Sequence, residues 1–452
     1  MTTRFRVIIV GAGPAGIFAA LELTRAGVDG ILLLEKGPDL PERQRLGRAA
    51  SMLSGWGGAG AYSDGKLALS TEIGGSMARY CSLTQLSELV EYVDETYRLF
   101  GAPGEIHGGD TEAVARLQRE AARLDMKLIP SRYRHLGTEG CEALLLRLRD
   151  HLAGPVVTRC GTPVAKVRVA DGRVTGVRLE DGTEIESACV VLAPGREGSS
   201  WLAKEAERLC LHTAINPVDI GVRIEVPASV MEDITRVTYE AKILYHTRHF
   251  EDMVRTFCMC PHGEVIREDL GGLYTVNGHS YAHRPTANTN FALLVSKTFT
   301  EPFREPIAYG QYIARLANML GGEVIVQRLG DLRQGRRSTP GRLGKGLVEP
   351  TLREATPGDL SLVLPYRYLA DILEMLEALD RLIPGVNSIH TLLYGVEVKF
   401  YSLQLKLAPT LETEIAGLFA VGDGAGVSRG LVQASASGVL AARAIAARLM
   451  GK

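Results

Sequence analysis

The feature that most constrains the fold of this chain is a glycine-rich turn near its start. Residues 7–10, Val-Ile-Ile-Val, are a continuous apolar run of the kind found in strands buried on both faces of a parallel sheet. Gly-Ala-Gly-Pro-Ala-Gly follows at residues 11–16, and residues 15–25 have a helical pattern that stops at Gly27. A second apolar run at residues 31–34 completes a strand–helix–strand unit. The sequence therefore predicts an α/β fold that begins with a parallel sheet.

Each glycine of this turn has a physical role. Gly11 allows the tight turn, Gly13 lets backbone N–H groups approach a diphosphate, and Gly16 lets the helix pack closely on the strand. Pro14 is pre-set for the first helical turn, so the phosphates would lie at the positive end of the helix. Glu35 ends the second strand, where a carboxylate can accept hydrogen bonds from adenosine ribose hydroxyls. The alternative is a turn with a purely structural role. However, the strand, the glycines, the helix and the acidic residue follow one another at the spacing of a dinucleotide-binding motif, which favours a dinucleotide site.

A second motif lies at the other end of the chain. Residues 417–421 predict a short strand, residues 422–424, Gly-Asp-Gly, a turn, and residues 430–450 a helix rich in small side chains. An aspartate at such a turn can bind a ribityl hydroxyl. The N–H groups near residues 430–432 can face the pyrimidine edge of a flavin, where the positive helix end would stabilise negative charge on the reduced ring. Alone this motif could be a buried turn, but its pairing with the first motif favours a flavin site.

The two motifs together resemble the FAD-binding fold of the glutathione-reductase-like flavoprotein superfamily. Residues 190–195, Val-Val-Leu-Ala-Pro-Gly, occupy the place of that superfamily's strand and Thr-Gly motif, with proline for the usual threonine. The resemblance covers residues 4–66, 155–200 and 412–450. It implies FAD as the cofactor and a three-layer Rossmann-type FAD-binding domain with an inserted α+β substrate domain.

A narrower resemblance begins in the segment 57–67, Gly-Gly-Ala-Gly-Ala-Tyr-Ser-Asp-Gly-Lys-Leu. This segment is similar to the signature of a group called FAD-dependent dehydrogenases. The same resemblance extends to residues 258–263, residues 277–280, residues 422–426, Arg429, Gly430 and Gln433. The pattern of the group has glycine where this chain has His262 and methionine where it has His279, which points to a changed substrate pocket.

The expected domain division follows from these matches. We expect residues 1–200 to form the N-terminal part of the FAD-binding domain, residues 201–400 a mixed substrate or cap domain, and residues 401–452 the C-terminal part of the FAD-binding domain. The residues expected to contact the cofactor are Gly11, Gly13, Pro14, Ala15, Gly16, Glu35, Lys36, Gly57, Gly58, Ser63, Gly65, Lys66, Val164, Gly195, Gly422, Asp423, Gly430, Leu431 and Val432.

Two residues are candidates for catalysis. Lys66 could polarise the flavin at N5 or N1 or bind a substrate carboxylate, while a solvated surface lysine is the alternative. His279 lies with Tyr281, His283 and Arg284 in the inserted region, which the resemblance places over the reactive face of the flavin. A general base is plausible there because imidazole titrates near neutral pH, although a single histidine is more often structural or exposed.

Two further clusters have less specific interpretations. Cys258 and Cys260 would lie on the same face of a strand, and the spacing favours two buried thiols over a strained disulfide. A basic loop follows later in the inserted region and comprises Arg333, Arg336, Arg337, Arg342 and Lys345. A solvated loop is the favoured interpretation of this second cluster, and an anionic substrate or the phosphate of a nicotinamide cofactor is the alternative.

Composition restricts the classes of function. A formal net charge of −1 over 452 residues argues against nucleic acid as a partner. Seven scattered cysteines fit a reduced, cytoplasmic protein, and their spacing with histidine predicts no metal site. No apolar run is long enough to cross a membrane.

The sequence therefore favours an FAD-dependent dehydrogenase or reductase that passes a hydride between a small, possibly anionic organic substrate and flavin N5. NAD(P)H is a possible transient electron donor or acceptor, and an electron-transfer protein is a possible partner. The alternatives are an oxygen-using monooxygenase or oxidase on the same fold, and a non-redox FAD-binding protein that recognises a partner.

Overall fold

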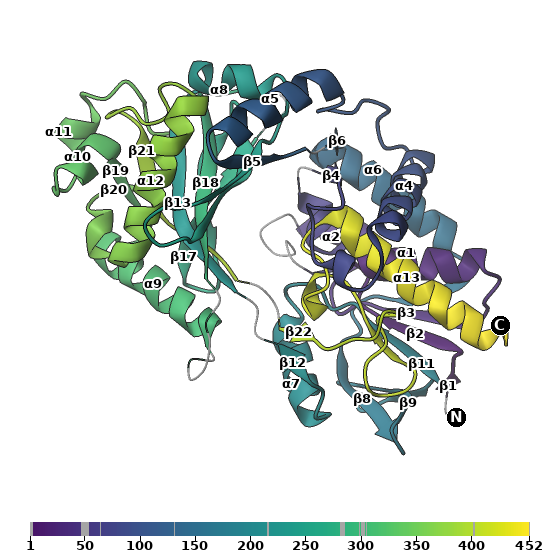
Figure 1. Cartoon of the computed structure of the whole chain (residues 1–452). Coiled ribbons are helices and arrows are strands. Elements are labelled where there is room, and N and C mark those ends of the chain that lie inside the picture. Colours follow the sequence, from purple (N-terminus) through teal and green to yellow (C-terminus); the bar gives the residue numbers. More distant parts are fainter. Residues whose placement is uncertain are drawn as a thin grey trace. The chain divides into compact units, whose positions relative to one another are not determined.

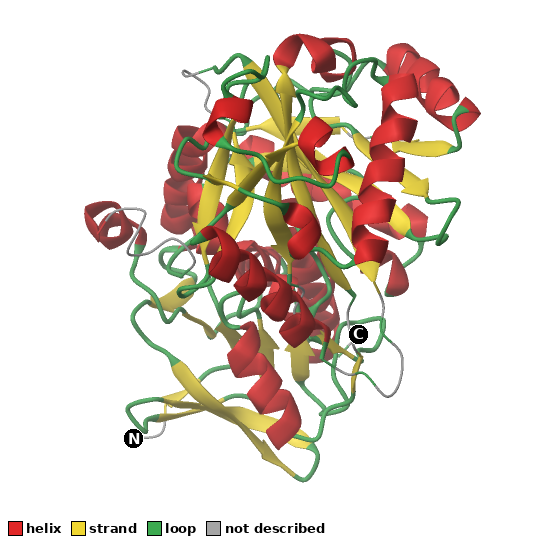
Figure 2. Cartoon of the chain, turned by 90° about the vertical axis from the view of Figure 1, so that its left-hand side faces the viewer, coloured by secondary structure: helices red, strands yellow, loops and turns green. Residues whose placement is uncertain are grey.

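The computed structural model describes residues 3–46, 54–63, 65–130, 132–214, 217–280, 285–297, 299, 303, 305–400 and 403–451 (Figure 1, Figure 2). The chain divides into two compact units. The first unit contains residues 1–106, 133–216 and 402–452, and the second contains residues 107–132 and 217–401. The observed division therefore differs from the expected one at residues 107–132, which belong to the second unit, and at residues 201–216, which belong to the first.

The first unit is built on a five-stranded parallel sheet with the order β23–β11–β2–β3–β7. The bounds of these strands are Leu418–Ala420, Cys189–Leu192, Val7–Val10, Ile31–Leu34 and Val156–Arg159. β2, β3 and β11 are buried at every position, which explains their continuous apolar sequences. β11 pairs with β2 on one side and with β23 on the other, so the two ends of the chain join one sheet.

Two layers cover this parallel sheet, as Figure 1 shows. On one face lie α1 (Pro14–Arg25) and α13 (Leu431–Leu449), which pack against each other. On the other face lies a four-stranded sheet with the order β1–β10–β9–β8. Its strands are Thr3–Arg4, Glu184–Glu186, Arg173–Leu179 and Val164–Ala170. The expectation of a three-layer Rossmann-type domain is confirmed.

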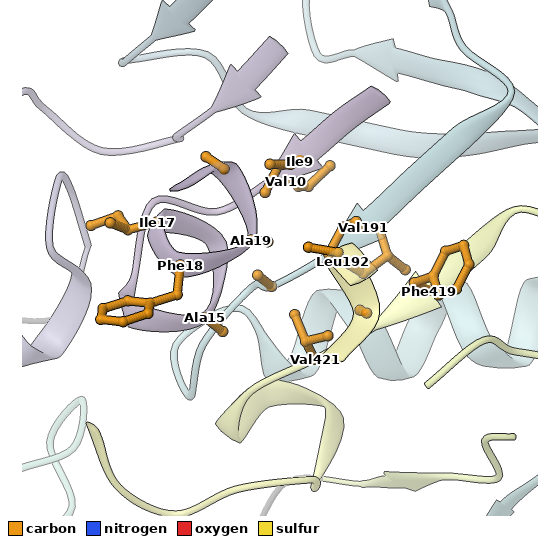
Figure 3. Close-up of a cluster of buried hydrophobic side chains, with 14 of the residues drawn as sticks. Ile9, Val10, Ala15, Ile17, Phe18, Ala19, Val191, Leu192, Phe419 and Val421 are labelled. Carbon is orange, nitrogen blue, oxygen red and sulfur yellow. The ribbon is translucent and has the colours of Figure 1, made fainter. Parts of the chain in front are cut away.

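The core between the helices and the parallel sheet is apolar (Figure 3). Ile9 of β2, Val191 of β11 and Phe419 of β23 are fully buried, and Phe18 of α1 lies in the same cluster (Figure 3). α13 is rich in alanine and contains Gly438, which lets its backbone approach α1 closely. A Cβ atom at Gly438 would lie only 2.0 Å from the Ala15 carbonyl oxygen. The small-residue helix seen in the sequence is thus an adaptation to this contact.

The segment 38–75, which has no clear period in the sequence, contains short regular elements in its described parts. They are α2 (Leu40–Leu46), the 3-10 helix η1 (Gly58–Tyr62) and β4 (Lys66–Leu69). β4 pairs with β6 (Arg132–His135), which is distant in sequence. These elements depend on tertiary contacts, which leave no local periodic pattern in the sequence.

The remaining elements of the first unit surround this core. They are η2 (Met77–Arg79), α4 (Leu83–Leu99), α6 (Gly137–Leu152), α7 (Ser199–Arg208), β12 (Thr213–Ala214), β22 (Gln404–Leu405) and η4 (Asp423–Ala425).

The second unit is built on an eight-stranded sheet with the order β20–β19–β21–β13–β18–β15–β14–β5. The strands are Thr356–Pro357, Ile325–Arg328, Leu392–Lys399, Val218–Pro227, Asn288–Lys297, Met253–Cys260, Lys242–His246 and Met126–Ile129. All neighbours are antiparallel except β19 and β20. The described part of this unit is an α+β structure.

Helices and a hairpin pack on the eight-stranded sheet. The helices α8 (Ala228–Thr235), α9 (Pro306–Gly321) and α12 (Tyr366–Leu382) contribute to one apolar core with it. The hairpin consists of β16 (Glu264–Asp269) and β17 (Tyr274–His279). The unit also contains α5 (Thr111–Arg123), α10 (Leu329–Arg333), α11 (Pro340–Leu343) and η3 (Leu360–Leu362). Among the residues that the structure places, no helix has the length and apolar character that a membrane span requires.

The contact between α1 and α13 gives a first prediction. Gly438→Ala should destabilise the protein by about 3 kcal/mol, because the new methyl group would overlap a backbone atom of α1. The free energy of unfolding in urea measures this loss. Gly140→Ala in α6 is the matched control, since its Cβ would lie 3.5 Å from the nearest atom, on Leu136. The control should be neutral or stabilising by about 0.5–1 kcal/mol, and equal effects at the two positions would contradict the packing argument.

Candidate functional site

The turn between β2 and α1 leaves one glycine open to approach. A Cβ atom at Gly11 would lie 2.1 Å from the Ala193 carbonyl oxygen, and one at Gly16 would lie 1.9 Å from the Gly11 carbonyl oxygen. These two glycines therefore lack side chains because the backbone packs tightly around them. At Gly13, by contrast, a Cβ would meet nothing within 4 Å. Gly13 is the place where a ligand can come close to the backbone.

The N-terminus of α1 offers hydrogen-bond donors at the same place. Gly13 is the N-cap residue and supplies no side-chain acceptor, Pro14 is the first helical residue, and the first turn contains no acidic residue. The first observed helical bond runs from the Ile17 N–H to the Gly13 carbonyl oxygen, at 2.9 Å. The N–H groups of Ala15 and Gly16 therefore have no partner within the helix. Open space, free donors and the positive end of the helix dipole fit the diphosphate of a dinucleotide.

Glu35 holds the backbone around this turn. Its side chain is 6% exposed, and its Oε2 accepts a hydrogen bond from the Ala12 N–H at 2.8 Å. Its Oε1 accepts from the N–H groups of Gly37 at 2.9 Å and Gly55 at 3.0 Å. A carboxylate has about four acceptor positions, so these donors leave one on Oε2 for a ribose hydroxyl. The structuring role of Glu35 adds to the ribose contact that the sequence suggests.

The segment 54–63 lies against the same turn. The Gly57 N–H donates to the Ala12 carbonyl oxygen at 2.8 Å, and a Cβ at Gly58 would lie 3.1 Å from the Gly13 Cα. Arg43 of α2 is fully buried and holds this segment by hydrogen bonds. Its Nη1 donates to the Trp56 carbonyl oxygen at 2.5 Å and to the Gly58 carbonyl oxygen at 3.0 Å. Burial lowers the pKa of Arg43, but a guanidinium remains charged in a protein.

Arg43 was missed in the sequence, because nothing local distinguishes it from the neighbouring arginines. Its buried charge is hydrogen-bonded to the backbone segment that contacts the glycine turn at residues 11–16. It is therefore a candidate for positioning that segment.

The end of the glycine-rich segment is held by local bonds. The Ser63 hydroxyl donates to the Gly60 carbonyl oxygen at 2.9 Å and accepts from the Gly65 N–H at 3.1 Å. Ser63 therefore shapes the turn before Lys66, and Asp64 lies outside the described residues. Lys66 is half-buried at the start of β4. These contacts position Lys66 on a strand rather than on a loose loop.

The C-terminal turn meets the N-terminal one. A Cβ at Gly422 would lie 3.0 Å from the Ala15 Cβ, and the Gly422 N–H donates to the Ser437 hydroxyl at 3.0 Å. Asp423 is half-buried, and its Oδ1 accepts a hydrogen bond from the Ser428 hydroxyl at 2.7 Å. Ser428 thereby fixes the carboxylate while its Oδ2 stays available for a ribityl hydroxyl. The two turns thus lie against each other within the first unit.

The N-terminus of α13 is also uncapped. Gly430 is its N-cap residue, no side chain caps it, and no acidic residue lies in its first turn. The N–H groups of Leu431 and Val432 therefore have no partner within the helix. Gln433, which is 1% exposed, donates from Nε2 to the carbonyl oxygens of Ile73 at 3.0 Å and Thr71 at 3.3 Å. This side chain ties the segment after β4 to the start of α13.

The other expected cofactor residues lie around the ends of the parallel strands. Lys36 is exposed and forms an ion pair with Glu197, and desolvation lowers its pKa while Glu35 opposes that shift. Val164 is buried at the start of β8. Gly195 has φ +63°, and a Cβ there would meet nothing within 4 Å.

The two candidate catalytic residues lie in different units. Lys66 belongs to the first unit. His279 belongs to the second unit, where it ends β17 and is half-buried opposite Glu264. Tyr281, His283 and Arg284, the other members of the expected polar cluster, lie outside the described residues.

The cysteine pair does not follow regular strand alternation. β15 has a bulge between Phe257 and Cys260, and Cys258 has φ +46°. Cys260 is buried, Cys258 is half-buried, and no disulfide joins them. The bulge inserts an extra residue, so spacing alone could not predict which face each thiol occupies.

The basic loop is partly neutralised by a buried acid. Asp331 is fully buried and accepts hydrogen bonds from Arg336 Nε at 2.9 Å, Arg328 Nε at 3.1 Å and the Ser338 hydroxyl at 2.8 Å. Burial by itself would raise the pKa of Asp331, but the hydrogen bonds from Ser338, Arg328 and Arg336 together hold it below its usual value. Arg333 donates to Asn387 Oδ1 at 2.8 Å. Arg333 and Arg336 therefore have protein partners, unlike those of a freely solvated loop.

In the parallel sheet of the first unit, an uncapped helix follows a glycine turn, and the C-terminal strand and helix complete the sheet and its helical layer. This arrangement defines a dinucleotide-binding flavoprotein fold. An uncharacterized protein of Clostridium beijerinckii is 28% identical over 478 aligned positions, which cover 97% of this chain and 80% of that protein. The chain is also similar to the solved L-proline dehydrogenase from P. horikoshii, with 12% identity and a TM-score of 0.43, covering 100% of this chain and 95% of that chain. A quinol-fumarate reductase shows 15% identity and a TM-score of 0.44, covering 99% of this chain and 72% of that chain.

Three family models match the chain. The model described as FAD dependent oxidoreductase matches residues 6–219. The model described as FAD-dependent protein, C-terminal domain-like, matches residues 217–400. The model described as glucose inhibited division protein A matches residues 359–452. The chain is an FAD-dependent oxidoreductase, and FAD is its cofactor. The site fits this cofactor because both uncapped helices and the open face of Gly13 lie in one unit.

A charge at Gly13 tests the diphosphate site. Gly13→Asp should give a folded protein without FAD, because the carboxylate repels phosphate but caps α1 well. The flavin released on denaturation and the far-ultraviolet circular dichroism measure occupancy and folding. Gly13→Asn is the control of equal size without charge and should retain more FAD than Gly13→Asp. A fully occupied, yellow Gly13→Asp protein would show that the phosphates lie elsewhere.

Proposed function

We propose that this chain is a dehydrogenase or reductase that moves a hydride between a small organic substrate and the flavin. The observation that carries this proposal is the contact between the two turns, at Gly422 and Ala15, since it makes one site from both ends of the chain. FAD, when bound, supplies two-electron chemistry at its N5 atom. The protein must then bind and orient the flavin and provide the electrostatic environment of its ring.

The described residues divide these tasks among themselves. The N–H groups at the start of α1 bind the diphosphate, and Glu35 binds the ribose while it holds the turn in shape. Asp423, oriented by Ser428, binds the ribityl chain. The N–H groups at the start of α13 face the pyrimidine edge, where the positive helix end favours the negative charge of the reduced state.

Lys66 is the proposed electrostatic catalyst of the first unit. It is half-buried, and the preceding turn and the following strand fix its backbone. A lysine placed this way can donate to a flavin nitrogen or to a substrate oxygen. His279 belongs to the second unit, and its role as a general base stays a prediction from the sequence.

Electrons reach the site from outside the chain. The second glycine-rich stretch, residues 341–346, overlaps the short helix α11 and does not continue from a buried strand. This supports one dinucleotide site, that for FAD, rather than a separate NAD(P) domain. We therefore propose that NAD(P)H binds transiently at the flavin or that a partner protein transfers the electrons.

The nicotinamide part of this proposal has a direct test. Under anaerobic conditions, NADH or NADPH should bleach the visible absorbance of the bound flavin, and one of the two should do so faster. Dithionite provides the control that the flavin is reducible. If dithionite bleaches the flavin and neither nicotinamide does, the transient NAD(P)H role fails and a protein donor is required.

Replacement of Lys66 tests its catalytic role. Lys66→Met should slow flavin reduction by the effective reductant by about 10- to 100-fold while the FAD content stays unchanged, because a donor to the developing charge is lost. Stopped-flow absorbance measures the rate. Lys166→Met, an exposed lysine of β8 in the same unit, is the control and should leave the rate unaltered. An unchanged rate in Lys66→Met would remove Lys66 from the mechanism.

A further inference from the structure

The guanidinium of Arg223 is buried in the sheet of the second unit and contacts two cysteines. Arg223 lies on β13 and is 0% exposed. Its Nη2 donates a hydrogen bond to the Cys258 carbonyl oxygen at 2.5 Å and lies 3.4 Å from the Cys260 Sγ. The side chain of Cys258 is also hydrogen-bonded to this guanidinium. Both thiols of β15 therefore converge on one charged group.

The backbone of β15 is shaped for this convergence. A bulge lies between Phe257 and Cys260, and Cys258 has φ +46°. Met259, between the two cysteines, is fully buried in the apolar core that the sheet shares with α12. The Cys260 Sγ lies 3.5 Å from the Cys258 carbonyl oxygen, so it is close to the peptide group of the other cysteine. The two thiols thus form a local pair, although the strand is irregular here.

The positive charge of Arg223 favours a thiolate at this pair. Glu397 pairs with Nη1 of Arg223, at 3.2 Å, whereas the sulfur of Cys260 lies at Nη2. Burial alone would lower the pKa of Arg223, but Glu397, Cys258 and Cys260 hold it above its usual value. Because such an interaction is mutual, the guanidinium also stabilises negative charge on sulfur. The thiolate is the form of cysteine that attacks a disulfide.

The two thiols differ in their access to solvent. Cys258 is half-buried, whereas Cys260 is only 1% exposed. A small disulfide from solution can therefore react at Cys258, and Cys260 can then react with a sulfur already attached there. Alternate residues of a strand are about 6.6 Å apart, which is near the upper limit that a disulfide spans. A disulfide in this position would be strained and readily reduced, as is typical of reversible rather than structural disulfides.

We propose that Cys258 and Cys260 form a redox-active dithiol that low-molecular-weight disulfides such as glutathione disulfide oxidise reversibly. The Cys258 thiolate attacks one sulfur of glutathione disulfide, breaks its S–S bond and releases one glutathione. Cys260 then attacks the Cys258 sulfur of this mixed disulfide and releases the second glutathione. The protein loses two electrons and two protons, and glutathione disulfide gains them as two thiols.

Arg223 stabilises the sulfur anions in both steps through its N–H groups. No electron passes through the flavin, and the pair belongs to the second unit, whereas the FAD site belongs to the first. The inference therefore adds a thiol modification site to the proposed flavin function and does not depend on it.

Oxidation of the native, FAD-loaded protein with excess glutathione disulfide at neutral pH tests this site. The remaining thiols are then alkylated with N-ethylmaleimide in denaturant, and the protein is digested with trypsin. Because trypsin cuts after Arg255 and Arg267, both cysteines lie in the peptide 256–267. After oxidation this peptide should carry no alkyl group and should be lighter than its dithiol form by two hydrogen atoms. Treatment of the native oxidised protein with dithiothreitol should restore both alkylation sites.

Cys81 of the first unit is the matched control for reactivity. It is also half-buried, and burial raises the pKa of its thiol. Cys258 should therefore react with glutathione disulfide about 10-fold faster than Cys81, since each unit of thiol pKa changes the thiolate fraction about tenfold at neutral pH. The glutathione content of each tryptic peptide, followed over time by mass spectrometry, gives the two rates.

Serine variants separate the roles of the two thiols. In Cys260→Ser the reaction should stop at the mixed disulfide, so the peptide 256–267 should carry one glutathione. In Cys258→Ser the buried Cys260 should stay reduced.

Three results would overturn the assignment. The first is that the peptide from the unaltered protein keeps two alkylated thiols after oxidation. The second is that each of the two cysteines carries its own glutathione, which would show that the thiols do not form a pair. The third is that Cys258 reacts no faster than Cys81, which would remove Arg223 from the chemistry.

Discussion

The structure of the first unit depends on the insertion of β11 between β2 and β23. This pairing brings the last strand of the chain into the same sheet as β2, one strand away, and the helices that follow β2 and β23, α1 and α13, pack against each other. Each contact requires small residues: Gly438 faces the Ala15 carbonyl oxygen, and Gly422 faces the Ala15 side chain. Ala15 is thus the point at which the two halves of the proposed cofactor site meet. A larger residue at any of these positions would separate the diphosphate end of the site from the flavin end.

The sequence predicted those parts of the site whose physics is local. The glycine turn at 11–16 and the turn at 422–424 follow apolar runs and precede helices, so their backbone functions can be deduced from a few residues. The positioning side chains could not be found in this way. Arg43 acts through backbone carbonyls of a distant segment, and Gln433 acts through carbonyls more than three hundred residues earlier. Such contacts carry no period or spacing, so they appear only in three dimensions.

The second unit shows how an alternating pattern can mislead. The sequence of β13, Val-Asp-Ile-Gly-Val-Arg-Ile-Glu-Val-Pro, alternates apolar and polar residues, which is typical of a strand with one solvent-facing side. Nine of its ten residues are nevertheless buried, including Asp219, Arg223 and Glu225. Residues from β15, β18 and β21 provide the partners of these charges, and the hairpin β16–β17 also packs here: a Cβ at Gly278 would lie 1.8 Å from Arg223 Nη2. A polar face that is removed from water and hydrogen-bonded makes the core rigid and specifies one arrangement of the strands and the hairpin.

Several features of the first unit are costly without the cofactor. Two helices begin at a glycine N-cap without a side-chain acceptor, so their first N–H groups have no partner within the helix, and a side-chain acceptor in place of such a glycine is worth only roughly a few tenths of a kcal/mol. Gly11, Gly57, Gly58 and Gly422 have positive φ angles, and glycine loses more backbone entropy on folding than other residues. A ligand that supplies acceptors to both helices recovers part of this cost, and it binds only the folded chain. Cofactor binding and folding of the first unit are therefore thermodynamically coupled, and the free energy of unfolding rises with the concentration of free FAD above its dissociation constant. The same open donors that make the apoprotein less stable are those that give the site its affinity for the dinucleotide.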